Sequence, residues 1–189
     1  MRSALPMFVF DLGTPALLRS YVRRLLPLLP PLSGRPIRIQ CRSGLHGSGG
    51  AIHAGSFLRE RRIAFDRDLG RYPTEFARIF VHELAHFAWL RLGNPLRRSY
   101  ESLILGELAR GARGELGWSA EWRKAALSPA DRPDRTRRWR EYVCESFCDS
   151  AAWRFAGLRR HPEFTLSDRW CRRRAQWFDR FFVTKRISI

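Results

Sequence analysis

The chain has 189 residues, of which 44% are hydrophobic and 13% aromatic, and its formal net charge is +17 at pH 7. This composition fits one globular domain over residues 1–189, and it excludes a disordered chain or a small scaffold that depends on disulfides. No run approaches the roughly 20 apolar residues of a membrane span and no signal peptide is convincing, so we expect a cytoplasmic protein with reduced thiols and no membrane partner.

The N-terminal part of the chain combines one helical pattern with several extended ones. Thr14 and Pro15 are typical of an N-cap and a first helical residue, and apolar residues then repeat at helical spacing until Pro27. The glycine-rich residues 43–50 lack the ending of a phosphate-binding loop, so we interpret them as an ordinary loop. Extended pieces are predicted at residues 37–41, 51–58 and 62–65. Together they favour a small, mostly antiparallel sheet.

The rest of the chain is predicted to be helical. The strongest helix begins near Pro73 and runs to Leu92, where Gly93 as a C′ residue and Pro95 are expected to end it. The other predicted helices cover residues 100–109, 120–127 (capped by Ser119), 136–155 (ended by Gly157) and 167–182. A small sheet combined with several helices predicts an α+β fold.

Residues 82–86 read His-Glu-Leu-Ala-His inside the strongest predicted helix. Four residues turn a helix by about 400°, so His82 and His86 emerge from one face at a spacing that allows both to bind one zinc ion. Glu83 points about 100° away from His82 and can serve as the general base toward a metal-bound water. The surrounding helix is apolar, and burial of these polar groups without a partner is costly. The alternative is a pair of core histidines satisfied by backbone groups or carboxylates.

A catalytic zinc site needs a third protein ligand. Glu141, Glu145 and Asp149 recur at every fourth residue of the helix predicted at 136–155, so they lie along one face. A bound cation would offset the repulsion between these acids, although a solvated acidic stripe paired with arginines is the simpler alternative. Rival ligands elsewhere in the chain are His46, His53, His161, Glu101 and Glu107.

An H-E-x-x-H helix followed by Glu145 and Asp149 on a second helix resembles the gluzincin metallopeptidases of the thermolysin-like clan. Residues 51–69 are similar to the antiparallel strands before the active-site helix in minimal members. The resemblance implies a single zincin-like domain in which a small sheet packs on the active-site helix and on a second, glutamate-bearing helix. It also implies Glu145 as the third ligand, Asp149 as the carboxylate that fixes the tautomer of His82, and an edge strand near 51–58 that pairs with substrate.

Two features depart from the clan. Cys144 stands where these enzymes often have asparagine, and the spacing from His86 to Glu145 is longer than usual, so residues 94–135 must form an insertion that returns to the site. Members of the clan also use a tyrosine or histidine to stabilise the oxyanion. The candidates for that role here are Tyr100, Tyr142 and His161.

These residues predict a zinc-dependent metallohydrolase, a peptidase that acts on a peptide or protein substrate with Zn²⁺ on His82, His86 and Glu145. The alternative is a catalytically inactive zincin-like basic module that binds nucleic acid or another anionic partner. The arginine excess, which is dense at residues 132–140 and 169–174, favours this alternative. A purely structural zinc is disfavoured because such a site has no use for Glu83.

Overall fold

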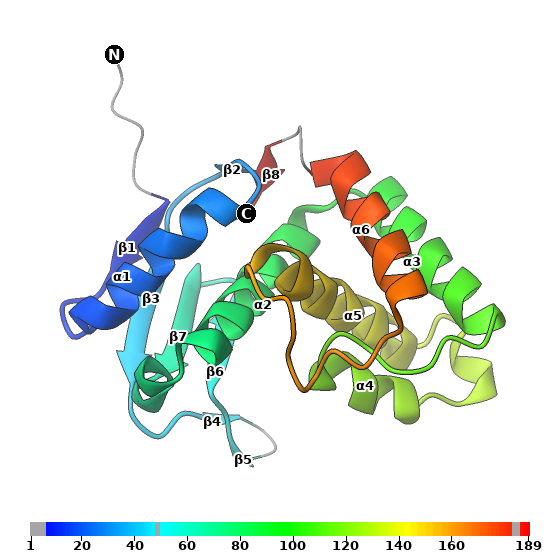
Figure 1. Cartoon of the computed structure of the whole chain (residues 1–189), viewed down its shortest axis with the longest axis horizontal. Helices are drawn as coiled ribbons and strands as arrows, with labels where there is room; N and C mark the ends of the chain where they lie inside the picture. The colour runs from blue at the N-terminus through cyan, green and yellow to red at the C-terminus, as the bar shows by residue number, and fades with distance from the viewer. Residues whose placement is uncertain (1–6, 48–49, 183–185) are drawn as a thin grey trace.

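A four-stranded sheet is built from the first third of the chain (Figure 1). The computed structural model describes residues 7–47, 50–182 and 186–189. The strands lie in the order β1 (Phe8–Phe10), β3 (Ile37–Arg42), β7 (Arg62–Asp66) and β6 (Ala54–Phe57). β1, β3 and β7 are mutually parallel, and only the edge strand β6 is antiparallel to its neighbour. The sheet is mixed, so the prediction of a mostly antiparallel sheet is wrong.

The connections between the strands explain this difference. Helix α1 (Ala16–Leu25) carries the chain from β1 to β3, and residues 43–61 carry it from β3 to β7. Such long crossovers return the chain in the same direction, whereas the short turn between β6 and β7 reverses it. The alternation of extended residues shows that strands form but does not show the direction of their pairing.

Two short strand pairs accompany the sheet. β2 (Leu32–Ser33) is parallel to β8 (Ile187–Ser188), and β4 (His46–Gly47) is antiparallel to β5 (Gly50–Ala51). The extended piece predicted at residues 51–58 is therefore divided between β5 and β6. Residues 48 and 49 of the predicted glycine-rich loop lie outside the described residues.

One face of the sheet packs against α1 and helix α2 (Pro73–Arg91). Along β3, Ile37 and Ile39 are buried while Arg38 is exposed, the alternation expected of a strand with one solvent face. Phe65 of β7 packs on the ring of Phe76 of α2 at a centroid distance of 5.0 Å. The sheet thus positions α2 through an aromatic contact one to two turns before His82.

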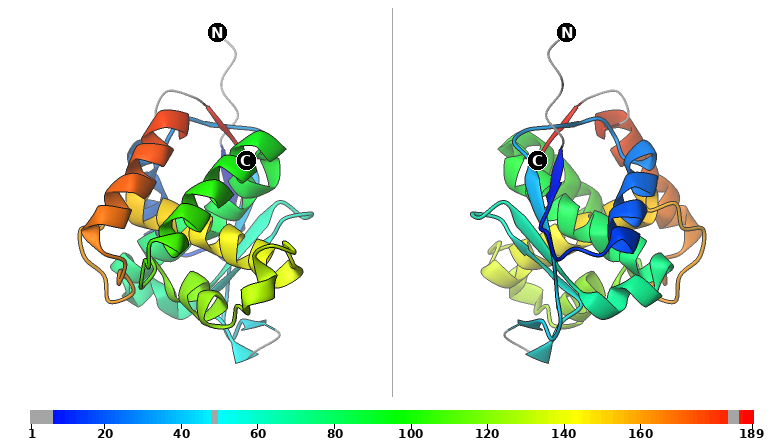
Figure 2. Two further views of the ribbon diagram at one scale, coloured as in Figure 1. Left: turned by 90° about the vertical axis from the view of Figure 1, so that its right-hand side faces the viewer. Right: turned by 90° about the vertical axis from the view of Figure 1, so that its left-hand side faces the viewer.

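Helix α2 lies between the sheet and helix α5 (Arg137–Phe155), as the views in Figures 1 and 2 show. The remaining helices, α3 (Asn94–Ala109), α4 (Trp118–Ala125) and α6 (Asp168–Phe182), surround α5 on its other sides. Short 3-10 turns cover Leu26–Leu28, Arg67–Arg71 and Pro129–Asp131. The described residues form an α+β fold, and none of the described helices has the length and apolar character needed to cross a membrane.

The junction between α2 and α3 differs from the prediction. Gly93 has φ −64° and ψ 156°, an extended conformation, so it does not form the expected left-handed C′ cap. Helix α3 begins at Asn94 instead of near residue 100, with Pro95 in its first turn. Proline cannot continue α2, but it fits the start of a helix because the N–H group it lacks has no partner there.

Two predicted N-caps are also wrong, whereas the expected glycine after α5 is present. The Thr14 hydroxyl donates to the Ile39 carbonyl in the neighbouring strand instead of capping α1. Helix α4 begins after Gly117 and is not capped by Ser119. Gly157, which follows α5, has φ +72°, the left-handed conformation that favours glycine at this position.

A buried ionic cluster fastens the segment 94–135 to the helices behind it. Arg174 of α6 is 1% exposed and contacts Glu107 of α3 at 2.8 Å and Glu115 at 2.7 Å. The Tyr142 hydroxyl of α5 donates to the other oxygen of Glu115. Burial raises the pKa of Glu115, but Arg174 outweighs it and holds the pKa below its usual range. The residues just before α4 are therefore fixed by charge as well as by packing.

Candidate metal centre

Three side chains from α2 and α5 converge on one point. The Nε2 atoms of His82 and His86 lie 3.2 Å apart. Glu145 Oε2 lies 3.2 Å from His82 Nε2 and 3.8 Å from His86 Nε2. In a tetrahedral zinc site with bonds of about 2.1 Å, neighbouring ligand atoms are about 3.4 Å apart. The three atoms therefore form one face of a tetrahedron of the size that zinc requires, and the residues present fit this ion.

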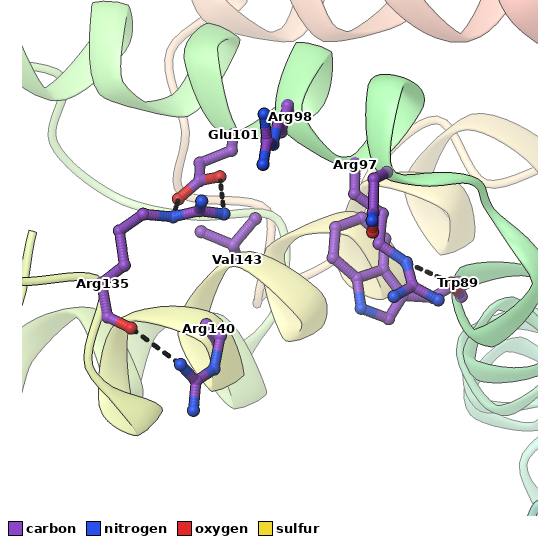
Figure 3. A pocket seen from close by; sticks show the side chains of 8 residues that line it. Trp89, Arg97, Arg98, Glu101, Arg135, Arg140 and Val143 are labelled. Carbon is purple, nitrogen blue, oxygen red and sulfur yellow. Dashed lines mark hydrogen bonds and ion pairs between the residues drawn. The ribbon is translucent and has the colours of Figure 1, made fainter.

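The rival carboxylates are committed to other partners. Glu101 accepts hydrogen bonds from Nε and Nη2 of Arg135 (Figure 3) and from the indole N–H of Trp139. Glu107 pairs with Arg174 in the buried cluster. Glu141 is more exposed and pairs with Arg137, one turn earlier on α5. Of the three acids on the predicted stripe, Glu145 alone offers an oxygen to the Nε2 atoms of both histidines, because α2 crosses α5 at that turn.

Asp149 supports His82 from behind. Its Oδ1 lies 2.7 Å from His82 Nδ1, and its carboxylate is completely buried. A carboxylate accepts hydrogen bonds, so Nδ1 is the donor and the Nε2 of a neutral His82 is free to face Glu145 and His86. The other oxygen, Oδ2, accepts the backbone N–H of Ala120 in the first turn of α4 at 2.9 Å. Asp149 thus joins the N-terminus of α4 to His82.

Gly117 makes this contact sterically possible. A Cβ atom at residue 117 would lie 2.2 Å from Asp149 Cγ and 2.3 Å from Oδ1. Real Cβ atoms do not approach other atoms so closely, and the carboxylate is held on both sides, so it cannot easily move. Residue 117 must therefore be glycine because of this close approach; its φ of 177° is ordinary extended backbone.

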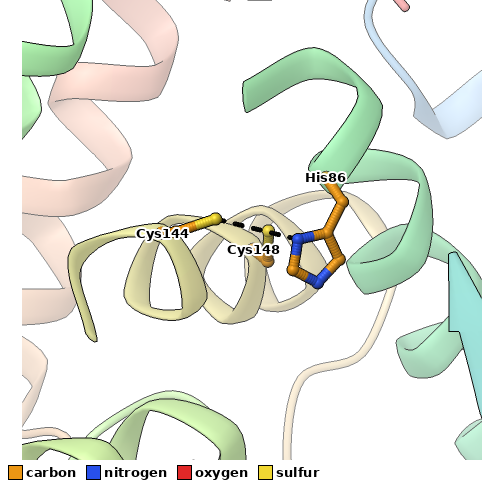
Figure 4. A group of neighbouring side chains, drawn as sticks. All are labelled: His86, Cys144 and Cys148. Carbon is orange, nitrogen blue, oxygen red and sulfur yellow. Dashed lines mark hydrogen bonds between the residues drawn. The ribbon is translucent and has the colours of Figure 1, made fainter. Parts of the chain in front are cut away.

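His86 also has a partner on its outer nitrogen. Cys144 Sγ lies 3.7 Å from His86 Nδ1, and Cys148 is on the next turn of α5 (Figure 4). A hydrogen bond from the Cys148 thiol outweighs burial and lowers the pKa of Cys144 to about 6, with His86 contributing in the same direction. Burial raises the pKa of the Cys148 thiol well above its usual range. Cys144 therefore faces His86 as Asp149 faces His82.

The same three residues form a second group of potential metal ligands, with all donor atoms within 4.8 Å of one another. This group fits a metal less well than the first. Cys148 keeps its proton at neutral pH, whereas a thiol must lose its proton to bind a metal.

The site has the electrostatic character of a place for a cation. Burial lowers the pKa of His82, but Asp149 and Glu145 outweigh it and raise the pKa well above its ordinary value. Burial raises the pKa of Glu145, yet His82, His86 and Arg123 hold it down to about 2. Positive charge is thus stabilised between the two histidines and Glu145. Without a metal ion, protons bound to the histidines carry this charge.

Glu83 lies beside these ligands but outside their cluster. Its carboxylate hydrogen-bonds with the hydroxyl of Ser56 on β6, and the Ser56 Oγ also lies 2.9 Å from the Glu83 carbonyl oxygen. β6 is the last strand of its sheet. The contact therefore places a sheet edge next to the carboxylate that was predicted to act as the base.

Arg123 of α4 contacts the remaining oxygen of Glu145. Its Nη2 lies 3.3 Å from Glu145 Oε1, and its Nη1 donates to the Ser119 carbonyl. Oε1 is held toward α4 while Oε2 faces the histidines, so the carboxylate offers one oxygen to a metal. The segment 94–135 returns to the site through α4 and supports two of the three candidate ligands without supplying one.

The other candidate histidines and tyrosines are engaged elsewhere. His46 contacts the Gly44 carbonyl on the surface. The Tyr100 hydroxyl bonds with Ser146 and Ser150, and Tyr142 bonds with Glu115; both rings are completely buried. The tyrosines are core residues in this structure, and no contact places either hydroxyl at the metal centre.

His161 belongs to a third group of potential ligands, together with Glu75 and Glu163. Arg78 pairs with both carboxylates, at 3.0 Å from Glu75 and 2.7 Å from Glu163. His161 bonds with Glu75. A cation is therefore already present between these acids, so they form an ion-pair network. His53 shares a cavity with this network but is not a member of the group.

The sequence interpretation missed four contributors: Ser56, Gly117, the N–H of Ala120, and Arg123. Each acts on a residue far away in the chain, so no local pattern marks it. The nearest signal is the mixture of glycine, tryptophan and charged residues at 111–127, which predicts a helix there but not what that helix contacts.

Comparison of this chain with protein-family models, with curated proteins and with solved structures gives no match.

Proposed function

We propose that this protein is a zinc-dependent metallohydrolase, a peptidase of the gluzincin type. The observation that carries the proposal is the triangle formed by His82 Nε2, His86 Nε2 and Glu145 Oε2, whose sides of 3.2, 3.2 and 3.8 Å suit a tetrahedral zinc. Zinc bound there would leave one position open, polarise a carbonyl group and lower the pKa of a bound water.

The chain's own residues supply the proton transfers and the orientation of the ligands. Glu83 would take the proton of the attacking water on its carboxylate and pass it to the nitrogen of the leaving amine. Ser56 holds that carboxylate in place. Asp149 keeps the proton of His82 on Nδ1, and Arg123 keeps Oε1 of Glu145 away from the metal position.

The arrangement of the elements supports a zincin-like fold. The H-E-x-x-H helix α2 lies between a small sheet and the glutamate-bearing helix α5, and the antiparallel edge strand β6 borders the site. An extended peptide can add to such an edge through main-chain hydrogen bonds. We propose that β6 pairs with the substrate backbone in this way.

A cavity lined by Arg78, one turn of α2 before His82, offers room for substrate side chains. It measures about 450 Å³ and lies between Tyr72 near the start of α2, Trp118 at the start of α4, and the ion-pair network around Arg78. Arg78 precedes His82 by one helical turn, which is about 6 Å along the axis. This separation is about the length of two residues of an extended peptide.

Metal content and hydrolysis together test the proposal. The purified chain, stripped of metal and reloaded, should bind one zinc ion. His86→Ala should lose it, whereas His46→Ala, a matched histidine on the surface, should retain it. Glu83→Gln should keep the zinc and lose hydrolysis of peptides that the wild type cleaves in a library. A wild type that takes up no zinc, or a Glu83→Gln variant as active as the wild type, contradicts the proposal.

A further inference from the structure

A second pocket lies between α3 and the beginning of α5, and half of its eight lining residues are arginines. Four of its lining residues are Arg97, Arg98, Arg135 and Arg140, and its volume is about 230 Å³. Figure 3 shows their guanidinium groups around one space, with Glu101 held by Arg135. The pocket shares no residue with the proposed metal centre.

The charge of this pocket is strongly positive. Glu101 is the only acid that lines it, and Arg135 neutralises that acid with two hydrogen bonds of 2.9 and 2.6 Å. Arg97, Arg98 and Arg140 then remain as three positive groups in a small volume. Like charges at such proximity repel one another unless an anion lies between them.

The guanidinium groups of Arg97 and Arg140 are held by hydrogen bonds, and all three groups retain free donors. Arg97 donates to the carbonyls of Trp89 and Leu90 at the end of α2 through Nε and Nη2, which leaves Nη1. Arg140 donates from Nη1 alone, to the Arg135 carbonyl. Arg98 is exposed and makes no side-chain hydrogen bond with the part of the chain that the structure describes. Each guanidinium carries five N–H donors, so most of them are free to bind a ligand.

The pocket between α3 and α5 adjoins another cavity. This neighbouring cavity of about 400 Å³ shares Arg98, Glu101 and Arg135 with the first and adds Arg132 and Ser102. We call these two adjoining cavities the arginine groove. The groove lies along the arginine-rich segment 132–140. Two adjoining cavities that share several guanidinium groups suit a chain of anions better than a single small anion. Guanidinium groups match phosphate in geometry and bind it through paired hydrogen bonds.

We propose that the arginine groove binds the backbone phosphates of a single-stranded nucleic acid. A positive groove that follows the backbone is the usual means of binding single strands with little sequence preference. The groove is concave, so a strand must bend to bring successive phosphates into it. A flexible single strand does this at low cost, whereas a stiff duplex does not.

The test uses the full chain, freed of co-purified nucleic acid, and a fluorescent single strand of about 20 nucleotides, long enough to cover one binding site. Binding is measured by anisotropy over a range of salt concentrations. The groove variant is Arg98→Ala with Arg140→Ala. The control is Arg23→Ala with Arg24→Ala, which removes the same charge from the exposed side of α1. Circular dichroism checks that both variants fold.

The groove variant should bind at least about tenfold more weakly than the wild type, and its salt slope should fall by about 1.4, since each lost phosphate contact in a single strand contributes about 0.7. The control should keep the wild-type slope. The proposal is overturned if the wild type does not bind the strand, if both variants weaken equally, or if a duplex of the same sequence binds as tightly. It is also overturned if inorganic phosphate alone stabilises the wild type, but not the groove variant, while the strand does not bind. The ligand would then be a small phosphate compound.

Discussion

Substitution of Gly117 by alanine is the most direct test of how α4 supports the metal centre. The added methyl group would lie 2.2 Å from Asp149 Cγ, inside the contact distance of any two carbon atoms. Asp149 cannot retreat without losing either His82 Nδ1 or the N–H of Ala120, which hold its two oxygens at 2.7 and 2.9 Å. Either the backbone of α4 or the carboxylate must move.

The cost follows from these two contacts. Overpacking in a tight interior usually costs about 1–3 kcal/mol. Loss of a buried hydrogen bond to a charged group adds about 1.5–3 kcal/mol. We therefore expect Gly117→Ala to lower the free energy of unfolding of the metal-free protein by about 2.5–6 kcal/mol. Because the orientation of His82 depends on Asp149, zinc affinity should fall about 10- to 100-fold.

Urea unfolding and zinc titration against a competing chelator measure the two effects. Gly13→Ala is the matched control, because a Cβ at residue 13 meets nothing within 4 Å. The free energy of unfolding of Gly13→Ala should be unchanged or higher than that of the wild type by up to about 1 kcal/mol. In an Asp149→Ala background, Gly117→Ala should lower the free energy of unfolding much less than in the wild type, because the carboxylate that the added methyl group would contact is absent. If Gly117→Ala leaves both stability and zinc affinity at wild-type values, α4 does not support the metal centre through Asp149.

The remaining predictions concern the charges around the site and the core. Asp149→Asn should weaken zinc binding about 10- to 100-fold, since partners behind a ligand typically have effects of this size. Arg123→Met should weaken zinc binding by no more than about fivefold, because the ion pair of Arg123 with Glu145 is partly exposed to solvent. Equal effects of Asp149→Asn and Arg123→Met in the same chelator titration would contradict the assigned contacts. Arg174→Met leaves buried carboxylates without their cation and should lower the free energy of unfolding in urea by about 3–5 kcal/mol. A decrease of less than about 1 kcal/mol would show that the ion pairs of Arg174 are dispensable. Hydrogen bonds, first that from Thr136, lower the pKa of Asp131 to about 2. The stability advantage of the wild type over Asp131→Asn should thus be complete above a pH of about 4 and shrink as the pH falls toward about 2, and a gap that stays constant in urea unfolding over this range would count against it.

The helices could be predicted from the sequence because their determinants are local. Apolar spacing located all the main helices, with errors at N-caps and at the start of α3, where Pro95 lies in the first turn of the new helix. The direction of the strands could not be predicted in the same way. It depends on the path that α1 and residues 43–61 take across the sheet, and alternation within a strand carries no information about that path.

In the candidate site too, features set within one helix could be predicted, and features set by contacts between helices could not. The spacing of His82 and His86 placed two nitrogens together, since a single helix determines their separation. The spacing of Glu141, Glu145 and Asp149 predicted a shared face of α5 but not their separate environments. Those depend on where α2 crosses α5, and the crossing leaves Glu141 near solvent, Glu145 at the histidines and Asp149 fully buried.

Helix α4 shows why the rest of the site required a structure. Its N-terminus is capped by a carboxylate 29 residues further along the chain, so no capping residue appears next to it in the sequence. The segment that leads into α4 is fixed at Glu115, two residues before Gly117, by the buried Arg174. A cation on α6 therefore sets the approach of α4 to Asp149, and Asp149 sets the orientation of His82. The geometry of the ligands thus depends on a helix that offers no ligand itself, and the stability of the insertion and the affinity of the site for metal should change together.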